Sequence, residues 1–350
     1  MSELKRCNIL VLGKTGVGKS SLLNYILDKE LEKTGVGRPQ TEKGIFPHEA
    51  NINGIDVKIF DTWGLEVGKD QEWKKLIQDH LKEHGIEKEI VDWIHAAIYC
   101  INVAGHRAED IDTKMIRELV DGGFHVTVAL TNADSLTESD EKKFCSVIYQ
   151  KIPKGSVSII PICSVIKKRR DGTETKRFGK NDLVDQILGS YRKLVIEKLP
   201  KRIVHLLLEE QKSLWNSLVG GSDGFPERIE DSEGKKRFTK EFQRITQKFA
   251  KETVPGIAKD ESQKISDVGE NLKLLLEDDP VKIKTRTIRI PPSFWEKFLN
   301  FFKKLFGIEE DETETHICIN DQFDLWKSRI ESFEEKIRES LQESLGTKNK

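Results

Sequence analysis

Short apolar runs alternate with longer amphipathic stretches over the first 199 residues of the chain. Continuous apolar runs between turn signals are typical of strands that are buried on both faces. Helical periodicity lies between most of these runs, and strands that alternate with helices predict a mostly parallel sheet with helices on both faces. The runs occupy residues 7–13, 57–61, 95–103, 125–131 and 156–163. Residues 1–199 are therefore expected to form a three-layer α/β domain.

The pattern becomes mostly helical after this point, which predicts a second, helical domain over residues 200–350. Pro200 is expected to end the helix that begins near Asp182, because proline lacks the backbone donor that a helix interior needs. Residues 220–234, GGSDGFPERIEDSEG, are rich in turn-forming residues and predict a loop.

A further helix is predicted near the C-terminus, starting at Asn320 or Asp321. Its apolar residues recur every three or four positions and form one face. They are Phe323, Trp326, Ile330, Phe333, Ile337 and Leu341. This face predicts packing within the helical domain, and a dimer seam is the alternative.

The residues GKTGVGKS (13–20) match the phosphate-binding pattern G-x-x-x-x-G-K-[ST], between a predicted strand and a predicted helix. Glycines allow the loop to turn its N–H groups toward phosphate at the positive end of the helix. The ammonium group of Lys19 is expected to reach the β- and γ-phosphates, and the Ser20 hydroxyl to ligate Mg²⁺. The nucleotide-binding residues predicted here are Gly13, Lys14, Thr15, Gly16, Val17, Gly18, Lys19, Ser20 and Ser21.

Three further motifs follow, each at the end of a predicted strand. In DTWG (61–64), Asp61 is expected to hold the metal and the Gly64 N–H to meet the γ-phosphate. In TNAD (131–134), the carboxylate of Asp134 can accept hydrogen bonds from guanine N1–H and the 2-amino group, which adenine does not offer. Thr131 and Asn132 belong to the same predicted base site. In CSV (163–165), Ser164 and Val165 can offer backbone N–H groups to guanine O6.

With these motifs in order, residues 5–199 resemble the P-loop GTPases of the translation-factor class, particularly the Era-like, septin-like and dynamin-like branches. The resemblance implies a P-loop NTPase G domain that binds GTP and GDP with Mg²⁺ and hydrolyses GTP. It also implies that Thr41 is the switch threonine that closes on Mg²⁺ and γ-phosphate, with Thr34 as the alternative.

The chain departs from the family pattern at two positions. Asn132 stands where N/T-K-x-D motifs carry a lysine that covers the base, which predicts weaker guanine binding. Leu65 follows DTWG where many GTPases have a glutamine that orients water, which predicts slow hydrolysis. Arg38 lies three residues before Thr41, which is the R-x-x-T spacing of an arginine finger supplied in cis. A partner or a nucleotide-dependent homodimer is another source of the catalytic group that replaces the missing glutamine. Leu65 also leaves open an alternative function, in which the chain is a scaffold that binds nucleotide and never hydrolyses it.

The segment SFWEKFLNFFKKLFG (293–307) holds five of the sixteen phenylalanines. On a helix its apolar residues fall within an arc of about 160°, opposite Lys and Glu. Residues 281–290 and 314–319 predict two strands, so that 281–319 would form a β-hairpin carrying this helix. The expected membrane contacts are Phe294, Trp295, Phe298, Phe301, Phe302 and Phe306. Packing in the core of the domain and binding to a groove of a partner are the alternatives.

Composition and charge limit the partners and the cellular compartment that can be expected. The net charge of −1 argues against a nucleic-acid binder, although residues 166–180 carry seven basic and two acidic residues. The five cysteines have no metal-ligand or disulfide spacing, which suits a reducing compartment. No leader peptide or spanning segment is recognisable, so a cytoplasmic protein is predicted, either soluble or on the periphery of an anionic membrane. A soluble assembly or signalling switch is the alternative to the membrane GTPase.

Overall fold

The computed structural model describes residues 6–14, 16–27, 45–52, 55–62, 70–105, 109–153, 155–168, 172–220, 224–276 and 317–345. The chain divides into two compact units. Unit 1 comprises Met1–Val195 and Asp267–Ile288, and unit 2 comprises Ile196–Ser266 and Arg289–Lys350. Helices α5 (Lys180–Val219) and α7 (Val254–Leu276) therefore each contribute residues to both units.

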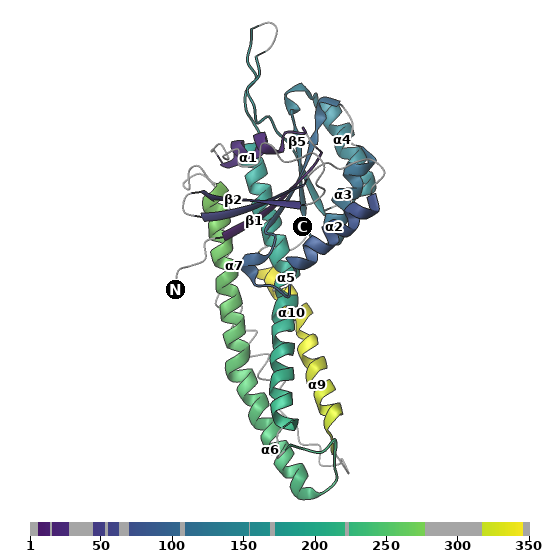
Figure 1. The fold of residues 1–350 in the computed structure, drawn as a ribbon, viewed down its shortest axis with the longest axis vertical. Helices are drawn as coiled ribbons and strands as arrows, with labels where there is room; N and C mark the ends of the chain where they lie inside the picture. The colour runs from purple at the N-terminus through teal and green to yellow at the C-terminus, as the bar shows by residue number, and fades with distance from the viewer. Residues whose placement is uncertain are drawn as a thin grey trace. The chain divides into compact units, whose positions relative to one another are not determined.

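Unit 1 is built on a six-stranded sheet with the order β2-β3-β1-β4-β5-β6 (Figure 1). Its strands are β1 (Arg6–Leu12), β2 (Ile45–Ile52), β3 (Ile55–Thr62), β4 (Ala96–Asn102), β5 (Val126–Thr131) and β6 (Val157–Pro161). All neighbouring strands are parallel except β2, which pairs antiparallel with β3. This confirms the mostly parallel sheet, and each of the five predicted strands is present.

The edge strand β2 was not predicted from the sequence. Its residues IFPHEANI mix apolar, charged and proline positions, so they show no continuous apolar run. A strand at the edge of a sheet has one hydrogen-bonded neighbour, so a proline such as Pro47 can be accommodated there. Only the pairing with β3 therefore identifies this segment as a strand.

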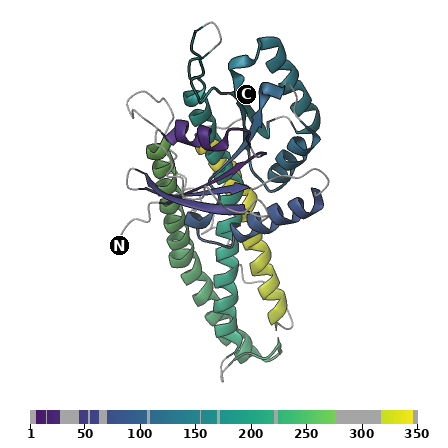
Figure 2. The ribbon, with the colours of Figure 1, turned by 45° about the horizontal axis from the view of Figure 1, so that its top comes forward.

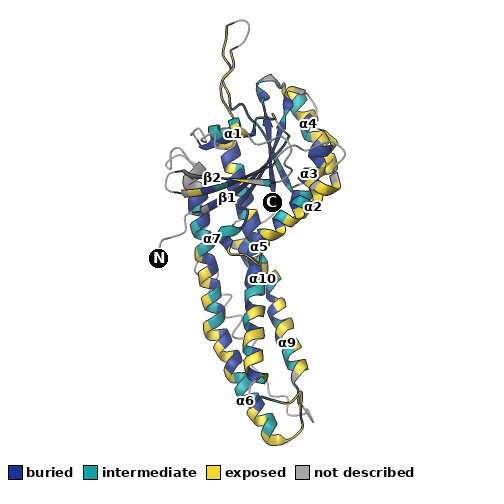
Figure 3. Ribbon diagram, in the orientation of Figure 1, coloured by how far each residue is buried: buried dark blue, intermediate teal, exposed yellow. Residues whose placement is uncertain are grey.

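Helices cover the sheet on both sides (Figures 1 and 2). α1 (Lys19–Leu27) and the beginning of α5 lie on one side, and α2 (Asp70–Glu83), α3 (Asp110–Asp121) and α4 (Glu138–Lys151) on the other. Short turns of 3-10 helix lie at Ile90–Asp92, Val103–Gly105 and Ala133–Ser135. Buried side chains gather on the strands and on the inner helix faces, while the outer faces are exposed (Figure 3). The predicted three-layer arrangement is therefore confirmed.

The prediction that Pro200 ends a helix is wrong, because α5 runs unbroken from Lys180 to Val219 with Pro200 inside it. Proline costs a helix interior about 3 kcal/mol. Leu199 and Ile203, on either side of the proline, are fully buried, and burial of such a side chain returns about 1.5–3 kcal/mol. Packing on both sides of Pro200 therefore offsets the lost hydrogen bond and keeps the helix continuous.

Unit 2 is helical, as expected. Besides its part of α5, it contains α6 (Ser232–Lys248), a π-helical turn at Phe249–Thr253, the first part of α7, α9 (Ile319–Glu331) and α10 (Phe333–Ser344). The predicted C-terminal helix is thus two helices that meet at Ser332. Trp326, Ile330 and Phe333 are buried, which confirms that their common face packs within the chain.

Aromatic rings form much of the core of unit 2. The indole of Trp215 lies 5.1 Å from the ring of Phe323, and Phe242 and Phe249 lie 5.7 and 5.2 Å from Trp326, measured between ring centroids. Phe242 also stacks on Phe238. Pairs of this kind add about 0.5–1.5 kcal/mol beyond the apolar area that they bury. The described helices of unit 2 therefore contain a well-formed aromatic core of their own.

The predicted β-hairpin and Phe-rich helix over residues 281–319 lie outside the described residues except for 317–319. The strand β8 (Ile317–Cys318) pairs antiparallel with β7 (Arg228–Ile229). β7 lies in the stretch 220–234, which the sequence predicted to be a loop, and is too short to give an apolar signal.

A buried ion pair joins α5 to α7 within unit 2. The Arg202 Nε donates to Glu261 Oε2 at 3.2 Å, and the two side chains are 3% and 2% exposed. Removing one partner of a buried pair leaves the other charge without its counterion in a poorly solvated site. The cost of such a change depends on burial, so an exposed pair in the same unit provides a comparison.

We expect Glu261→Gln to lower the free energy of unfolding by about 3 kcal/mol, because the guanidinium of Arg202 would stay buried opposite a neutral group. Thermal and urea unfolding followed by circular dichroism would measure this. Glu241→Gln, which removes an exposed ion pair with Arg244 on α6, should leave both curves unchanged. An unaltered curve for Glu261→Gln would contradict the role given to the buried pair.

His125, at the beginning of β5, is held neutral by its surroundings. Lys193 Nζ lies 3.1 Å from its Nδ1, and Ser158 Oγ lies 2.8 Å from its Nε2. Burial, and then the neighbouring Lys193 ammonium, lower the pKa of His125 to about 4. The unfolded chain therefore binds a proton at this histidine between about pH 6.5 and 4, whereas the folded chain does not.

We expect stability to be lost as pH falls from about 6.5 to 4, by up to about 1.4 kcal/mol per pH unit from His125. His125→Gln keeps an acceptor for Lys193 and removes the titrating group, so it should flatten this slope. Melting temperatures measured between pH 7.5 and 4 would test it, with His205→Gln in unit 2 as the control. An equal slope in wild type and His125→Gln would refute the assignment.

Candidate functional site

Those predicted nucleotide-binding residues that the structure describes lie near one edge of the sheet. The carboxyl ends of the parallel strands β1, β3, β4, β5 and β6 meet there. The register pairs Val11 of β1 with Asp61 of β3, and Asn102 of β4 with Thr131 of β5. In open α/β sheets ligands bind outside these strand ends. The phosphate loop, Asp61 of DTWG and Thr131 of TNAD therefore lie where a nucleotide would be expected.

The loop after β1 has the backbone conformation of a phosphate cradle. Gly13, Gly16 and Gly18 have φ angles of 137°, 78° and 96°. A side chain at Gly13 would also place its Cβ 2.5 Å from the Cys100 carbonyl oxygen. Glycine is therefore required at this position both by backbone strain and by the close approach of β4.

Lys19 begins helix α1 and lies back across this loop. Its side chain is largely buried, and its Nζ donates to the carbonyl oxygens of Gly13 at 3.0 Å and Lys14 at 3.1 Å. The ammonium group is thus held against the backbone of the phosphate loop, next to the N-terminus of α1. A cation and a helix N-terminus at the same place form a strong site for anionic phosphate.

Thr131 connects the end of β5 to the phosphate loop. Its hydroxyl donates to the carbonyl oxygen of Val17 and lies 3.2 Å from that of Ile101 in β4. The side chain is almost completely buried. The position of the TNAD motif relative to the phosphate loop is therefore fixed by a short side-chain contact.

Asn132 has a left-handed backbone, with φ 58° and ψ 33°. Its Nδ2 donates to Asn102 Oδ1 at 3.1 Å, and that oxygen also accepts from the N–H of Ala104 at 3.0 Å. Asparagine tolerates this conformation better than most residues. Asn132 is therefore turned toward the end of β4 by its side-chain contact.

Asp134 lies in the turn that follows Asn132, and its side chain is 15% exposed. Its Oδ1 is 3.2 Å from Lys167 Nζ and 3.8 Å from Cys163 Sγ. The N–H of Ala133 donates to Ile162 O at 3.1 Å, which joins the turn to the end of β6. Ser164 and Val165 continue from there, and Val165 is 42% exposed. The structure thus brings TNAD and CSV together, as the sequence predicted.

Three contacts next to the phosphate loop were not found by sequence reasoning. Lys14 Nζ forms an ion pair with Glu109 Oε2 at 2.7 Å and lies 3.6 Å from Asp112 Oδ2. The hydroxyl of Tyr99 donates to Asp112 Oδ1 at 2.9 Å. These residues are far apart in the sequence and form no motif, so only the folded chain shows that the phosphate loop is joined to the N-terminus of α3.

Two of the residues predicted to ligate Mg²⁺, Ser20 and Asp61, lie in described elements of the chain. Ser20 is exposed in the first turn of α1, and Asp61 lies in β3, in register with the end of β1. Mg²⁺ is usually bound by one or two protein oxygens and by substrate phosphates rather than by a full protein cage. Among the described residues no cluster of three or more His, Cys, Asp and Glu side chains could hold a metal ion.

Several predicted residues lie outside the described ranges. They are Thr15 of the phosphate loop, Thr34, Arg38, Thr41, Gly64 and Leu65 of the switch segments, and Phe294, Trp295, Phe298, Phe301, Phe302 and Phe306 of the Phe-rich segment. Their roles remain predictions. Within the described part of the chain, no helix is both long enough and apolar enough to cross a bilayer.

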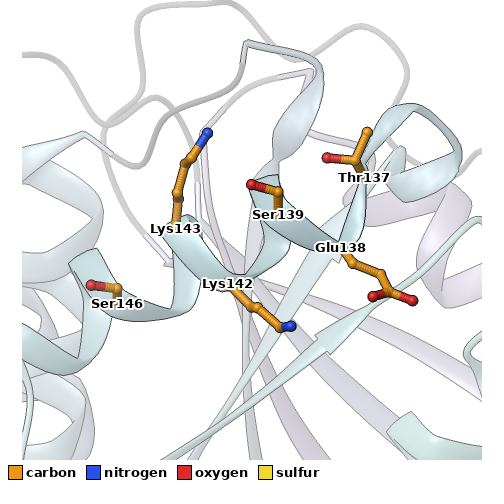
Figure 4. A pocket seen from close by; sticks show the side chains of 6 residues that line it. All are labelled: Thr137, Glu138, Ser139, Lys142, Lys143 and Ser146. Atoms are coloured by element: carbon orange, nitrogen blue, oxygen red, sulfur yellow. The ribbon is translucent and has the colours of Figure 1, made fainter.

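A separate surface hollow lies on α4 (Figure 4). Its lining consists of Thr137, Glu138, Ser139, Lys142, Lys143 and Ser146. These side chains come from one helix and its N-cap, and none belongs to the phosphate loop or the base motif. The hollow is thus distinct from the strand-end site.

Comparison with known proteins agrees with the motifs. Residues 8–132 match the family described as 50S ribosome-binding GTPase. The chain is 24% identical over 171 residues to Septin-8-A of Danio rerio, covering 43% of this chain and 40% of the septin. It is 34% identical over 135 residues to Translocase of chloroplast 108 of Physcomitrium patens, covering 37% of this chain and 13% of that protein. The chain thus spans well under half the length of these curated relatives.

Among solved structures, Toc33 from Arabidopsis thaliana in complex with Mg²⁺ and GMPPNP matches with a TM-score of 0.38 and 17% sequence identity. The match covers 56% of this chain and 87% of that one. A septin GTPase domain from Chlamydomonas reinhardtii matches with a TM-score of 0.35 and 17% identity, over 53% and 92% of the two chains.

Proposed function

We propose that this chain, which carries a P-loop GTPase domain matched over residues 8–132, binds GTP and GDP with Mg²⁺ and hydrolyses GTP slowly. The observation that carries the proposal is the arrangement of Lys19 and Asp134 at one edge of the sheet, joined through Thr131. Lys19 would bind the phosphates and Asp134 the base. The two residues are far apart in the sequence, and the parallel pairing of β1, β4 and β5 brings their segments to the same edge of the sheet.

The phosphate end of the proposed site rests on charge and backbone geometry. The positive φ angles of the loop glycines would allow backbone N–H groups to turn toward phosphate, and Lys19 supplies a cation at the N-terminus of α1. Ser20 and Asp61 would hold Mg²⁺ together with the nucleotide phosphates, and Thr41 would complete the site in the GTP state. Bound Mg²⁺ would neutralise the charge that develops on the transferred phosphate.

The base end rests on donor and acceptor complementarity. A carboxylate at Asp134 accepts from guanine N1–H and the 2-amino group, and an adenine in the same place would leave it unpaired. The adjacent backbone of Ser164 and Val165 would donate to guanine O6. The proposed specificity is therefore for guanine over adenine nucleotides.

The rate of hydrolysis is proposed to be low because Leu65 cannot orient the attacking water. Arg38, three residues before Thr41, is the proposed source of positive charge in the transition state. A nucleotide-dependent homodimer is a second source, since a residue supplied in trans can replace a missing catalytic group.

We expect the wild-type chain to release phosphate from GTP at a rate of the order of 10⁻³ s⁻¹. Lys19→Ala should abolish turnover and weaken GDP binding, because the phosphates would lose the cation at the loop. Phosphate release under single-turnover conditions and fluorescent-GDP titration would measure the two effects. Lys142→Ala on α4 is a matched lysine variant away from the site and should behave as wild type.

Turnover that persists in Lys19→Ala would contradict the assigned role, and a wild type that binds GDP without turnover would favour the non-hydrolysing scaffold. Asp134→Asn should lose the preference for guanine over adenine nucleotides. An unchanged preference in that variant would mean that another residue reads the base.

We further propose that the Phe-rich segment 293–307 binds an anionic membrane, which would make the protein a peripheral membrane GTPase of the cytoplasm. Its sequence places the apolar residues on one helical face and Lys303 and Lys304 on the other. A soluble assembly or signalling switch is the competing function.

Co-sedimentation with liposomes rich in phosphatidylserine would test this in the presence of GDP and of a non-hydrolysable GTP analogue. Wild type should pellet with the vesicles, and Phe301→Glu/Phe302→Glu should stay in the supernatant while keeping wild-type nucleotide binding. A difference between the two nucleotides would show that the domain and the segment communicate. Wild type that stays soluble in both states would exclude membrane binding and favour the soluble switch.

A further inference from the structure

The base motif of this chain is incomplete in sequence but receives a lysine from elsewhere in the fold. TNAD carries Asn132 at the position where the family pattern has a lysine. Lys167, from the segment after β6, donates through its Nζ to Asn132 Oδ1 at 2.8 Å and to Asp134 Oδ1 at 3.2 Å. An ammonium group thus bridges the residue that replaces the motif lysine and the carboxylate that would read guanine.

The backbone at Lys167 is held in a defined position. Its N–H donates to the Thr175 hydroxyl at 2.7 Å, and the Thr175 N–H donates to the Lys167 carbonyl oxygen at 2.9 Å. Thr175 is 7% exposed. Bridges between Cys163 and Phe178 and between Lys168 and Glu174 continue this antiparallel ribbon, which follows β6 and precedes α5 in the sequence and extends away from the sheet (Figure 1). Lys167 therefore extends toward the motif from a paired backbone.

The contacts on Asp134 leave acceptor sites of its carboxylate available for a base. Lys167 Nζ and Cys163 Sγ both approach the same carboxylate oxygen, Oδ1. A carboxylate has about four lone-pair sites on its two oxygens, so it can accept from an ammonium group and still accept from guanine donors. The ammonium group also orients the carboxylate and would offset part of the negative charge of the site when a nucleotide is bound.

We propose that Lys167 is a positioning residue of the guanine subsite, which supplies from the β6–α5 ribbon the lysine that TNAD lacks. This inference rests on the proposed function, because it assumes that Asp134 reads the base. Lys167 orients Asp134 and holds Asn132, and through them it strengthens binding of guanine but not of nucleotide phosphates. Lys167, one of the seven basic residues of the segment 166–180, would then be part of the nucleotide site.

The test compares GDP and ADP dissociation constants for the full chain, measured by competition with a fluorescent nucleotide. In Lys167→Ala we expect GDP to bind about tenfold more weakly, since a hydrogen bond to a charged group is lost. ADP should bind as in wild type, because its affinity comes from the phosphate loop. The ratio of the two affinities should therefore fall by about the same factor, a result that general loosening of the site would not give.

Lys168→Ala is the matched control, since Lys168 is the exposed neighbour on the same ribbon. It should leave both constants unchanged, and the melting temperature of Lys167→Ala should equal that of wild type. Lys167→Arg keeps a cation of similar reach and should restore part of the guanine preference.

Three outcomes would overturn the inference: unchanged GDP affinity in Lys167→Ala, equal weakening of GDP and ADP, or tighter GDP binding. The last would mean that Lys167 occupies Asp134 in competition with the base. A wild type that binds no guanine nucleotide would overturn the proposed function itself, and the inference with it. If the wild type binds GDP and Lys167→Ala binds it with the same affinity, the inference is overturned but the proposed function is not.

Discussion

The hydroxyl of Thr131 holds together the parts of the domain that a nucleotide would contact at both ends. It reaches the Val17 carbonyl in the phosphate loop and lies next to that of Ile101 in β4, while its own backbone ends β5. The contact is buried, so it is not weakened by competition with water. Because of it, the phosphate loop and the TNAD turn have a fixed spacing, on which the placement of Asp134, and then of Lys167, depends.

Polar side chains far apart in the sequence extend this constraint across the edge of the sheet. Asn102 joins the end of β4 to Asn132, and Lys14 joins the phosphate loop to Glu109 at the N-terminus of α3. Each contact ties a loop to a buried strand or to a helix terminus. The site is therefore held by rigid elements although its residues lie in turns, an arrangement that binding sites require for precise geometry.

The helical unit shows a similar use of buried polar contacts. Arg202 and Glu261 pair in the buried part of this unit, where Lys264 Nζ also lies 2.9 Å from the second carboxylate oxygen of Glu261. A pair of this kind costs desolvation and so contributes little to net stability, but it penalises arrangements in which either charge stays alone. In α5 and α7 it would specify how the two helices pack, while the aromatic rings of Trp215, Phe242 and Trp326 provide the apolar burial.

The sequence by itself identified the five parallel strands of the sheet and the motifs of the candidate site. Continuous apolar runs identified the parallel strands because burial on both faces leaves a local signal, and the phosphate loop was readable because its backbone requires glycines at close spacing. Tertiary structure decided the rest. The edge strand β2, the continuity of α5 through Pro200 and the contacts of Lys14 and Lys167 depend on partners distant in the chain. Pairing and packing energies of that kind leave no periodic pattern, so only the folded chain brings Lys167 to Asp134.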